Sequence, residues 1–167
     1  MRLPRIKTPD RVTCYHLRAR IIGPRHFYPF EKPRIKRMIL HCLNKFLRLY
    51  CCQLVDFNIM GNHIHLILRF QPYRRLSKRE LHRRACAYYR RPADRPQTPR
   101  QWRRFNRRLF DVSEFMRNLD GAIARDYNDS HNRRGSLFID RFGASILATP
   151  AAVLNCMIYL DLNPVRA

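Results

Sequence analysis

The sequence predicts an α+β fold, in which a mostly antiparallel sheet is covered by helices on one face in a ferredoxin-like split βαβ arrangement. One segment alternates polar and apolar residues with a period of two, which is typical of a half-buried strand. Two apolar segments flank a Gly-Asn pair, which favours a hairpin. Amphipathic segments complete the order strand, helix, two strands, basic insert, helix, strand, helix.

The first strand is expected over residues 12–22, before Gly23-Pro24. One face carries Thr13, Tyr15, Leu17, Ala19 and Ile21, and the other carries His16, Arg18 and Arg20. A helix is expected from Pro33, because the fixed φ of proline suits the first helical turn. Its apolar residues recur at helical spacing as far as Leu49. Strands over 51–60 and 63–70 follow, joined at a tight turn.

We expect a single domain of residues 1–167 with an insert at about 71–110. Three more elements are predicted after this insert. A helix over about 111–128 begins at an aspartate or serine cap. A strand is expected from 136 to about 142. In the last helix Thr149 is the cap and Pro150 the first residue. That helix is expected to end near Asn163, because a proline follows.

The composition favours a polyanionic partner. The 167 residues include 34 lysines and arginines against 12 acidic residues, a formal net charge of +22. Each cation that meets a phosphate releases condensed counterions, although an acidic protein or an anionic membrane surface could also attract this charge. No apolar stretch reaches the length of about 18 residues that a transmembrane helix needs. The start lacks a secretory signal and the six cysteines form no Cys-x-x-Cys pair, so a reduced, cytoplasmic protein is expected.

His63 and His65 are the first candidates for chemistry. Residues two apart on a strand point to one face, so both imidazoles project together while Ile64 points to the opposite layer. Two neutral imidazoles at this separation can share one metal ion and leave coordination positions for substrate oxygens and water. The plain alternative is a pair of partly exposed strand histidines without a ligand.

Tyr159 is the second candidate. The apolar stripe of the last helix, which consists of Val153, Cys156 or Met157, and Leu160, is the expected core face. Tyr159 lies outside this stripe, in a polar row with Asn155 and Asn163. A helical tyrosine most often packs at the edge of a core, but one on a polar row can serve as a nucleophile. A phenol has an ordinary pKa of about 10, so its attack at neutral pH needs help from a cation or a base.

Four segments resemble the landmarks of a known protein family, and they occur in the same order along the chain as in that family. Residues 60–68 (Met-Gly-Asn-His-Ile-His-Leu-Ile-Leu) resemble the His-hydrophobe-His strand of single-tyrosine HUH transposases, with Gly61 where those proteins often have proline. Residues 159–167 (Tyr-Leu-Asp-Leu-Asn-Pro-Val-Arg-Ala) resemble the tyrosine helix of the REP-associated tyrosine transposases. Residues 15–20, and 135–138 with Arg141-Phe142, resemble further landmarks of that family.

The resemblance implies a ferredoxin-like, nucleoid-associated enzyme that cleaves and rejoins single-stranded or hairpin DNA, such as a REP element, as a monomer or a homodimer. His63 and His65 would hold Mg²⁺ or Mn²⁺, with Asn163 in the place of a third ligand. Tyr159 would attack the scissile phosphate and leave a 5′-phosphotyrosine and a free 3′-OH. Hard cations prefer oxygen, so a two-imidazole site should hold Mn²⁺ better than Mg²⁺.

The insert is the candidate DNA-binding surface. Between positions 74 and 108 there are thirteen arginines and one lysine against two acidic residues, interrupted by prolines that predict a linker between short helices. Aromatic residues lie among these charges, a composition suited to phosphates and unstacked bases. The arginines expected to bind DNA are Arg74, Arg75, Arg83, Arg84, Arg103, Arg104, Arg107 and Arg108 of the insert, and Arg133 and Arg134 of a later loop.

Two alternatives from other classes stay open. A decayed or domesticated relative could bind structured DNA or RNA without cutting it, and the high charge and the end at Ala167, where relatives commonly continue, favour that interpretation. A basic RNA-processing or ribosome-associated protein would explain the charge, but would give no role to the paired histidines or the tyrosine.

Overall fold

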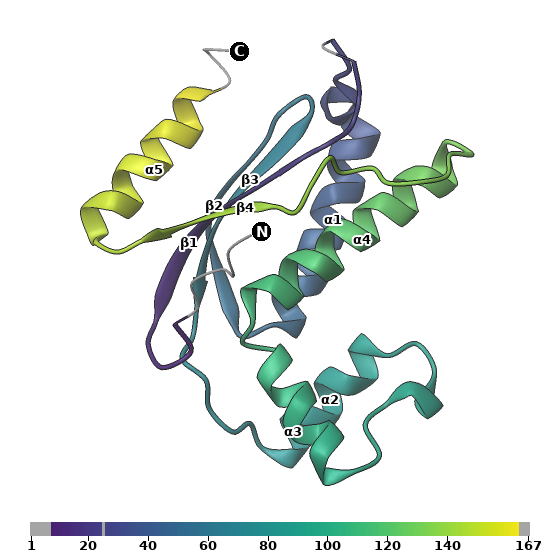
Figure 1. Ribbon diagram of the computed structural model, residues 1–167, viewed down its shortest axis with the longest axis vertical. Helices are drawn as coiled ribbons and strands as arrows, with labels where there is room; N and C mark the ends of the chain where they lie inside the picture. Colours follow the sequence, from purple (N-terminus) through teal and green to yellow (C-terminus); the bar gives the residue numbers. More distant parts are fainter. Residues whose placement is uncertain (1–7, 25, 164–167) are drawn as a thin grey trace, which may run out of the picture.

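The computed structural model describes residues 8–24 and 26–163 (Figure 1). The sheet in this part of the chain consists of β1 (Thr13–Arg20), β2 (Cys52–Ile59), β3 (His63–Phe70) and β4 (Gly143–Leu147). The strands lie in the order β2-β3-β1-β4, and every pairing is antiparallel. The α+β class and the antiparallel sheet are therefore confirmed, and the order of strands is that of a split βαβ arrangement.

Helices cover both faces of this sheet, whereas the sequence predicted one covered face. The helices α1 (Pro33–Leu49) and α4 (Val112–Ser130) lie against one face, and α5 (Pro150–Leu162) lies over the other (Figure 1). The helix α5 contacts the sheet directly, since its residue Leu160 is fully buried. In residues 8–24 and 26–163 no helix is long and apolar enough to cross a membrane.

The main core forms between the sheet and the helices α1 and α4. The alternation predicted for β1 is confirmed, since Tyr15, Leu17 and Ala19 are buried while Arg18 and Arg20 are exposed. The helix expected at Pro33 begins there. The cap of α4 is Asp111, whose carboxylate accepts hydrogen bonds from the first backbone N–H groups of that helix. The buried residues of the two helices are Ile35, Ile39, Cys42, Leu43, Phe46, Leu49, Val112, Phe115, Met116, Leu119, Ala122, Ile123 and Tyr127.

The arginine-rich insert has its own small core. It contains α2 (Lys78–Tyr88), the 3-10 turn η2 (Pro92–Asp94) and α3 (Pro99–Arg108). Two of the prolines that predicted a linker therefore begin helical turns. The buried residues are Cys51, Leu76, Ala85, Phe105 and Leu109, and Leu81, Tyr88, Tyr89, Trp102 and Phe110 pack against them. Some of the aromatic residues that were expected to stack on bases therefore pack in or against this core instead. Phe105, for example, is only 1% exposed.

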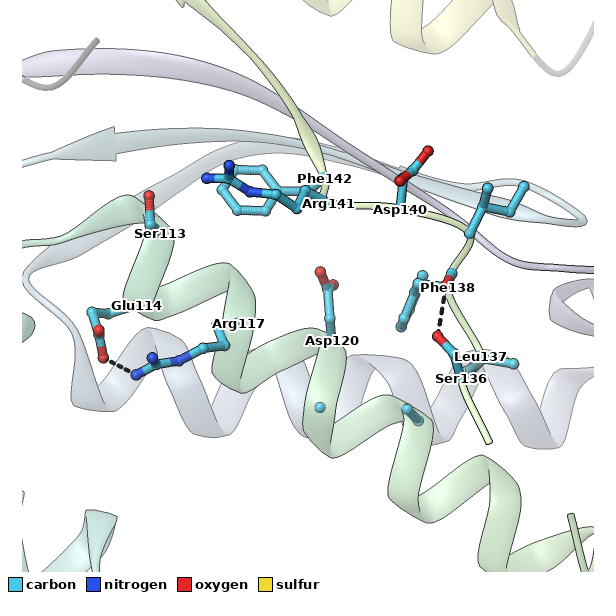
Figure 2. Close-up of a pocket in the computed structure, with 13 residues that line it drawn as sticks. Ser113, Glu114, Arg117, Asp120, Ser136, Leu137, Phe138, Asp140, Arg141 and Phe142 are labelled. Atoms are coloured by element: carbon cyan, nitrogen blue, oxygen red, sulfur yellow. Dashed lines mark hydrogen bonds and ion pairs between the residues drawn. The ribbon is translucent and has the colours of Figure 1, made fainter. Parts of the chain in front are cut away.

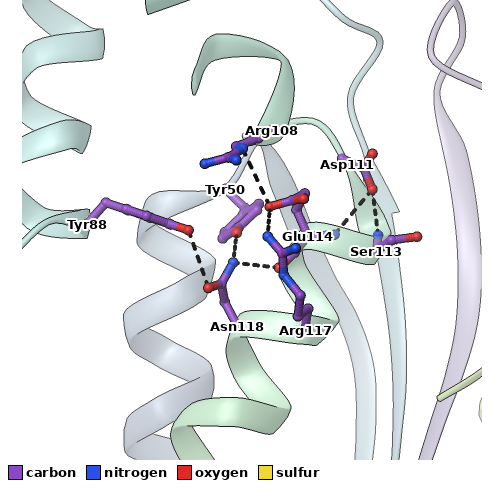
Figure 3. A network of polar contacts seen from close by, with 8 residues as sticks. All are labelled: Tyr50, Tyr88, Arg108, Asp111, Ser113, Glu114, Arg117 and Asn118. Carbon is purple, nitrogen blue, oxygen red and sulfur yellow. Dashed lines mark hydrogen bonds and ion pairs between the residues drawn. The ribbon is translucent and has the colours of Figure 1, made fainter. Parts of the chain in front are cut away.

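Polar contacts join the insert to the main fold (Figure 3). Asn118 of α4 donates to the hydroxyl of Tyr50 at 2.7 Å and accepts from the hydroxyl of Tyr88 at 3.3 Å. Arg108, at the end of α3, lies 3.8 Å from the carboxylate of Glu114. Side chains from α2, α3 and α4 therefore meet in one place, which holds the insert against the C-terminal end of α1 and the N-terminal end of α4 (Figure 1).

The prediction of a strand over residues 136–142 is wrong. The strand that pairs with the second edge of β1 is β4, which begins at Gly143. The Ser136 hydroxyl donates to the carbonyl of Phe138 at 2.7 Å, and Ile21 and Phe138 form only an isolated bridge (Figure 2). Leu137 and Phe138 are both buried, because this segment packs into the core instead of extending the sheet. With α4 it lines a pocket of about 530 Å³ on the side of the sheet away from α5.

Candidate active site

The hairpin between β2 and β3 positions the paired histidines. Its turn is held by two backbone hydrogen bonds of 3.0 Å, from Phe30 N–H to Gly61 C=O and from Ile21 N–H to Asn62 C=O. A Cβ atom at position 61 would lie only 2.7 to 2.9 Å from three side-chain atoms of Tyr28. The close approach of Tyr28 therefore leaves no room for a Cβ atom at position 61 unless that side chain shifts.

The two histidines lie on the face of the sheet that α5 covers. Ile64, between them, is buried in the main core, as the alternation of the strand requires. The rings of His63 and His65 have centroids 4.9 Å apart and lie edge to face. The expectation that both imidazoles project together is confirmed in its geometry.

His16 on β1 joins this pair, and the sequence did not single it out. Its Nε2 atom lies 2.8 Å from Nδ1 of His65, and the two rings are nearly parallel at 5.1 Å. In the β1–β3 register Arg18 pairs with His65 and Arg20 with His63. The period-two alternation already placed His16 on the correct face, but the contact with His65 depends on the register between the strands.

Hydrogen bonds leave one ring nitrogen of each paired histidine available. His63 Nδ1–H donates to Oδ1 of Asn62 at 2.7 Å, so the lone pair of His63 lies on Nε2. His65 is 1% exposed, and its Nε2 atom is buried with no hydrogen-bond partner in the described residues. A buried polar atom without a partner is uncommon in proteins and requires an explanation.

The histidines are uncharged at neutral pH. Burial, followed by the neighbouring His63, His16 and Arg18, lowers the pKa of His65 to about 3. Burial lowers the pKa of His63, and the positive charges of Arg20 and Arg18 lower it further. The pKa of His16 is lowered by burial and then by Arg18. The site therefore presents neutral imidazoles beside two exposed guanidinium groups.

Tyr159 reaches the histidines from α5. The helix begins as expected, with the Thr149 hydroxyl accepting from Ala152 N–H. It is held to the sheet by the buried Leu160, whose carbonyl accepts from Asn58 Nδ2 at 2.6 Å. The Tyr159 ring is 46% exposed, and its centroid lies 6.2 Å from that of His65 and 6.5 Å from that of His16, edge on to both. The structure thus brings the tyrosine and the histidines together, although more than 90 residues separate Tyr159 from His65 in the sequence.

The remaining residues of α5 follow the prediction only in part. Asn163 lies at the C-terminal end of the helix, half-buried, and within the described residues it makes no hydrogen bond to a histidine. Within the predicted apolar stripe only Leu160 is fully buried, and Val153, Cys156 and Met157 are half-buried. Large apolar residues on the outer side are exposed, namely Leu154, Ile158 and Leu162.

The donor set fits a divalent cation held by two imidazoles. Across residues 8–24 and 26–163, no group of three or more His, Cys, Asp or Glu side chains is arranged to hold a metal ion. His63 and His65 each use Nδ1 in a hydrogen bond, and neither Nε2 atom is hydrogen-bonded within the part of the chain that the structure describes. Metal-binding histidines commonly have this arrangement, in which one nitrogen is bonded to a neighbour and the other binds the metal.

The ten arginines expected to bind DNA fall into two groups. Seven are exposed, namely Arg74, Arg75, Arg83, Arg103, Arg104, Arg107 and Arg134. Arg84, Arg108 and Arg133 are partly buried. Arg84 donates to the carbonyl of Leu49 at the end of α1 and to Glu80 at 2.9 Å, so its guanidinium is used within the fold.

Comparisons with known proteins agree with this fold. No protein-family model and no curated protein matches the chain. A solved structure of a REP-associated tyrosine transposase bound to a REP hairpin superposes with a TM-score of 0.63 at 12% identity, over 99% of this chain and 74% of that one. A protein of Deinococcus radiodurans R1, provisionally classed as a transposase, gives a TM-score of 0.48 at 14% identity over 96% of both chains, which is too low to carry an argument.

The chain therefore has the fold of a REP-associated tyrosine transposase. The resemblance inferred from the histidine strand and the tyrosine helix is confirmed at the level of the fold. At 12% identity the comparison establishes the fold alone, so the activity has to be argued from the site.

Proposed function

We propose that this protein is a transposase-type DNA endonuclease and strand transferase that acts on single-stranded or hairpin DNA, with Tyr159 as its nucleophile. The observation that carries the proposal is the approach of the Tyr159 ring to within 6.2 Å of His65 and 6.5 Å of His16. The structural neighbour is a transposase bound to a REP hairpin, and we extend that class of DNA to this chain.

In the proposed reaction the phenolic oxygen of Tyr159 attacks the scissile phosphorus. A bond forms between the tyrosine oxygen and phosphorus, and the bond from phosphorus to the 3′ oxygen breaks. The phenol loses one proton and the leaving 3′ oxygen gains one, so no net proton is consumed. The products are a 5′-phosphotyrosine and a free 3′-OH. Attack of a 3′-OH on the phosphotyrosine reverses these steps and joins strands without a nucleotide cofactor.

His63 and His65 would hold Mg²⁺ or Mn²⁺ through their Nε2 atoms, with Asn163 as the proposed third ligand. Such a cation supplies Lewis-acid catalysis, because it withdraws charge from a phosphate oxygen. The neutral state of the histidines suits this role, since a protonated imidazole has no lone pair to share. Arg18 and Arg20 lie beside the histidines on the same face and add positive charge that attracts the phosphate backbone.

Substitution of Tyr159 by phenylalanine tests the nucleophile. The variant should form no covalent protein–DNA adduct with a single-stranded hairpin oligonucleotide in Mn²⁺, measured on a denaturing gel. Its binding to the same oligonucleotide should stay almost unchanged. Tyr73→Phe is the matched control, because Tyr73 is 37% exposed and its ring packs against Phe110 of the insert at a centroid distance of 5.6 Å. Adducts that persist in Tyr159→Phe would show that another residue is the nucleophile.

The second candidate function is binding of structured DNA or RNA without cleavage. It is favoured by the burial of His65, which is only 1% exposed, and by the net charge of +22. The same assay separates the two candidates, because wild-type protein that binds the hairpin but forms no adduct in Mn²⁺ or Mg²⁺ would support binding alone. Competition between DNA and RNA hairpins of one sequence would then identify the preferred nucleic acid.

A further inference from the structure

His16 lies next to the proposed metal ligands without being one of them. It is on β1, and His65 is 49 residues away in the sequence on the adjacent strand β3. In the β1–β3 register His16 pairs with Ile67, so His16 and His65 are diagonal neighbours on one face. The contact of 2.8 Å between His16 Nε2 and His65 Nδ1 is short enough for a hydrogen bond.

This contact has two arrangements of the shared hydrogen. A neutral imidazole carries hydrogen on one nitrogen only, so either His65 donates to His16 or His16 donates to His65. If His16 donates, the hydrogen of His65 lies on Nε2, which is buried without a partner in the described residues. A buried N–H group without an acceptor destabilises the fold, so this arrangement is disfavoured. If His65 donates instead, Nε2 holds a lone pair, which is what a cation needs.

We infer that His16 is a positioning residue that accepts the Nδ1 hydrogen of His65 and thereby keeps the His65 Nε2 lone pair free for a divalent cation. That the ligand of Nε2 is a cation rests on the proposed function. The tautomer of His65 rests only on its contact with His16 and on the burial of its Nε2 atom. The arrangement matches that of His63, whose Nδ1 hydrogen goes to the side chain of Asn62. Both histidines thus have a neighbour that holds the hydrogen away from Nε2.

The same contact argues against His16 as a third metal ligand through Nε2. One lone pair cannot accept the hydrogen of His65 and bind a cation at the same time. In the part of the chain that the structure describes, no cluster of three histidine, cysteine or acidic side chains has the geometry of a metal site. His16 therefore acts through His65.

The test is the tautomer of His65, read by long-range ¹H–¹⁵N correlation NMR on metal-free, ¹⁵N-labelled protein at pH 7.5. We expect the Nδ1–H form of His65 in the wild type, with its signals assigned by their loss in His65→Gln. His16→Phe keeps a ring but removes the acceptor, so the Nδ1–H signature of His65 should be lost. His16→Gln retains an acceptor oxygen and should restore it. Wild-type His65 in the Nε2–H form, or an unchanged tautomer in His16→Phe, would overturn the inference.

Binding of Mn²⁺ provides the second measurement, made by electron paramagnetic resonance of the free ion. Loss of an outer hydrogen-bond partner typically weakens metal binding by about 10- to 100-fold, and we expect this loss in His16→Phe but not in His16→Gln. Equal Mn²⁺ affinity in all three proteins would overturn the positioning role. Absence of DNA adducts in the wild type would refute the proposed function instead, and it would not alter the NMR result.

Discussion

The burial of His65 predicts that the metal-free protein loses stability as the pH falls below neutrality. Burial and the neighbouring groups lower the pKa of this imidazole from 6.5 to about 3 in the folded protein. In the unfolded chain a histidine has a pKa of about 6.5. Below that pH the unfolded state binds a proton that the folded state does not bind. The stabilisation is therefore fully present above pH 6.5 and is lost as the pH falls toward 3.

The size of the loss follows from the two pKa values. Each pH unit costs up to about 1.36 kcal/mol for one proton of difference. Between pH 7.5 and 4.5 the contribution of His65 to the free energy of unfolding should fall by about 2 to 3 kcal/mol. The lowered pKa values of His16 and His63 act in the same direction, so the total loss should exceed that of His65 alone.

The assay is urea unfolding at pH 7.5, 6.5, 5.5 and 4.5 in the presence of a chelator, followed by circular dichroism. Fluorescence is less suitable, because the single tryptophan, Trp102, packs against the small core of the insert and would report on that part of the chain. His65→Gln should show a shallower decline with falling pH than the wild type. His26→Gln, at an exposed histidine, should follow the wild type. Wild-type and His65→Gln curves that stay parallel over the whole range would refute the reasoning.

Two further predictions concern the turn and the insert. Gly61→Ala should lower the free energy of unfolding by about 1–3 kcal/mol, because the new Cβ atom would overlap the side chain of Tyr28. Gly121→Ala is the control, since its Cβ atom would meet only a guanidinium nitrogen at 3.8 Å; there urea unfolding should show a gain of up to about 1 kcal/mol. Arg84→Ala should lower stability, because its guanidinium holds the end of α1. Arg104 is exposed, so Arg104→Ala should instead weaken hairpin binding, measured by fluorescence anisotropy, and reduce the log–log salt slope by about 0.7 to 0.9. Equal salt slopes in the two arginine variants, or equal stability changes in the two glycine variants, would contradict these assignments.

The insert shows where prediction from composition fails. Its arginines and aromatic residues suggested one nucleic-acid-binding surface, but the structure divides them by burial. Phe105 belongs to a small core, and Arg84 satisfies the carbonyl of Leu49, whereas Arg104 is exposed. A side chain of either type serves packing or binding equally well on chemical grounds. Only the position of the helices decides which role each one has.

The sequence alone determined the local elements. The period-two alternation of β1, the Pro33 start of α1 and the Thr149 cap of α5 are short-range signals, and each appears in the structure where it was predicted. The spacing of His63 and His65 likewise placed both rings on one face, because the alternation of a strand is a local property.

Only the tertiary structure decided what meets those rings. The contact of His16 with His65 requires a particular register between β1 and β3, and the approach of Tyr159 requires α5 to lie over that face of the sheet. The segment 136–142 is likewise not a strand, because Leu137 and Phe138 pack into the core. Register, layer order and core packing depend on contacts between residues far apart in the chain. Local propensity and spacing do not contain that information.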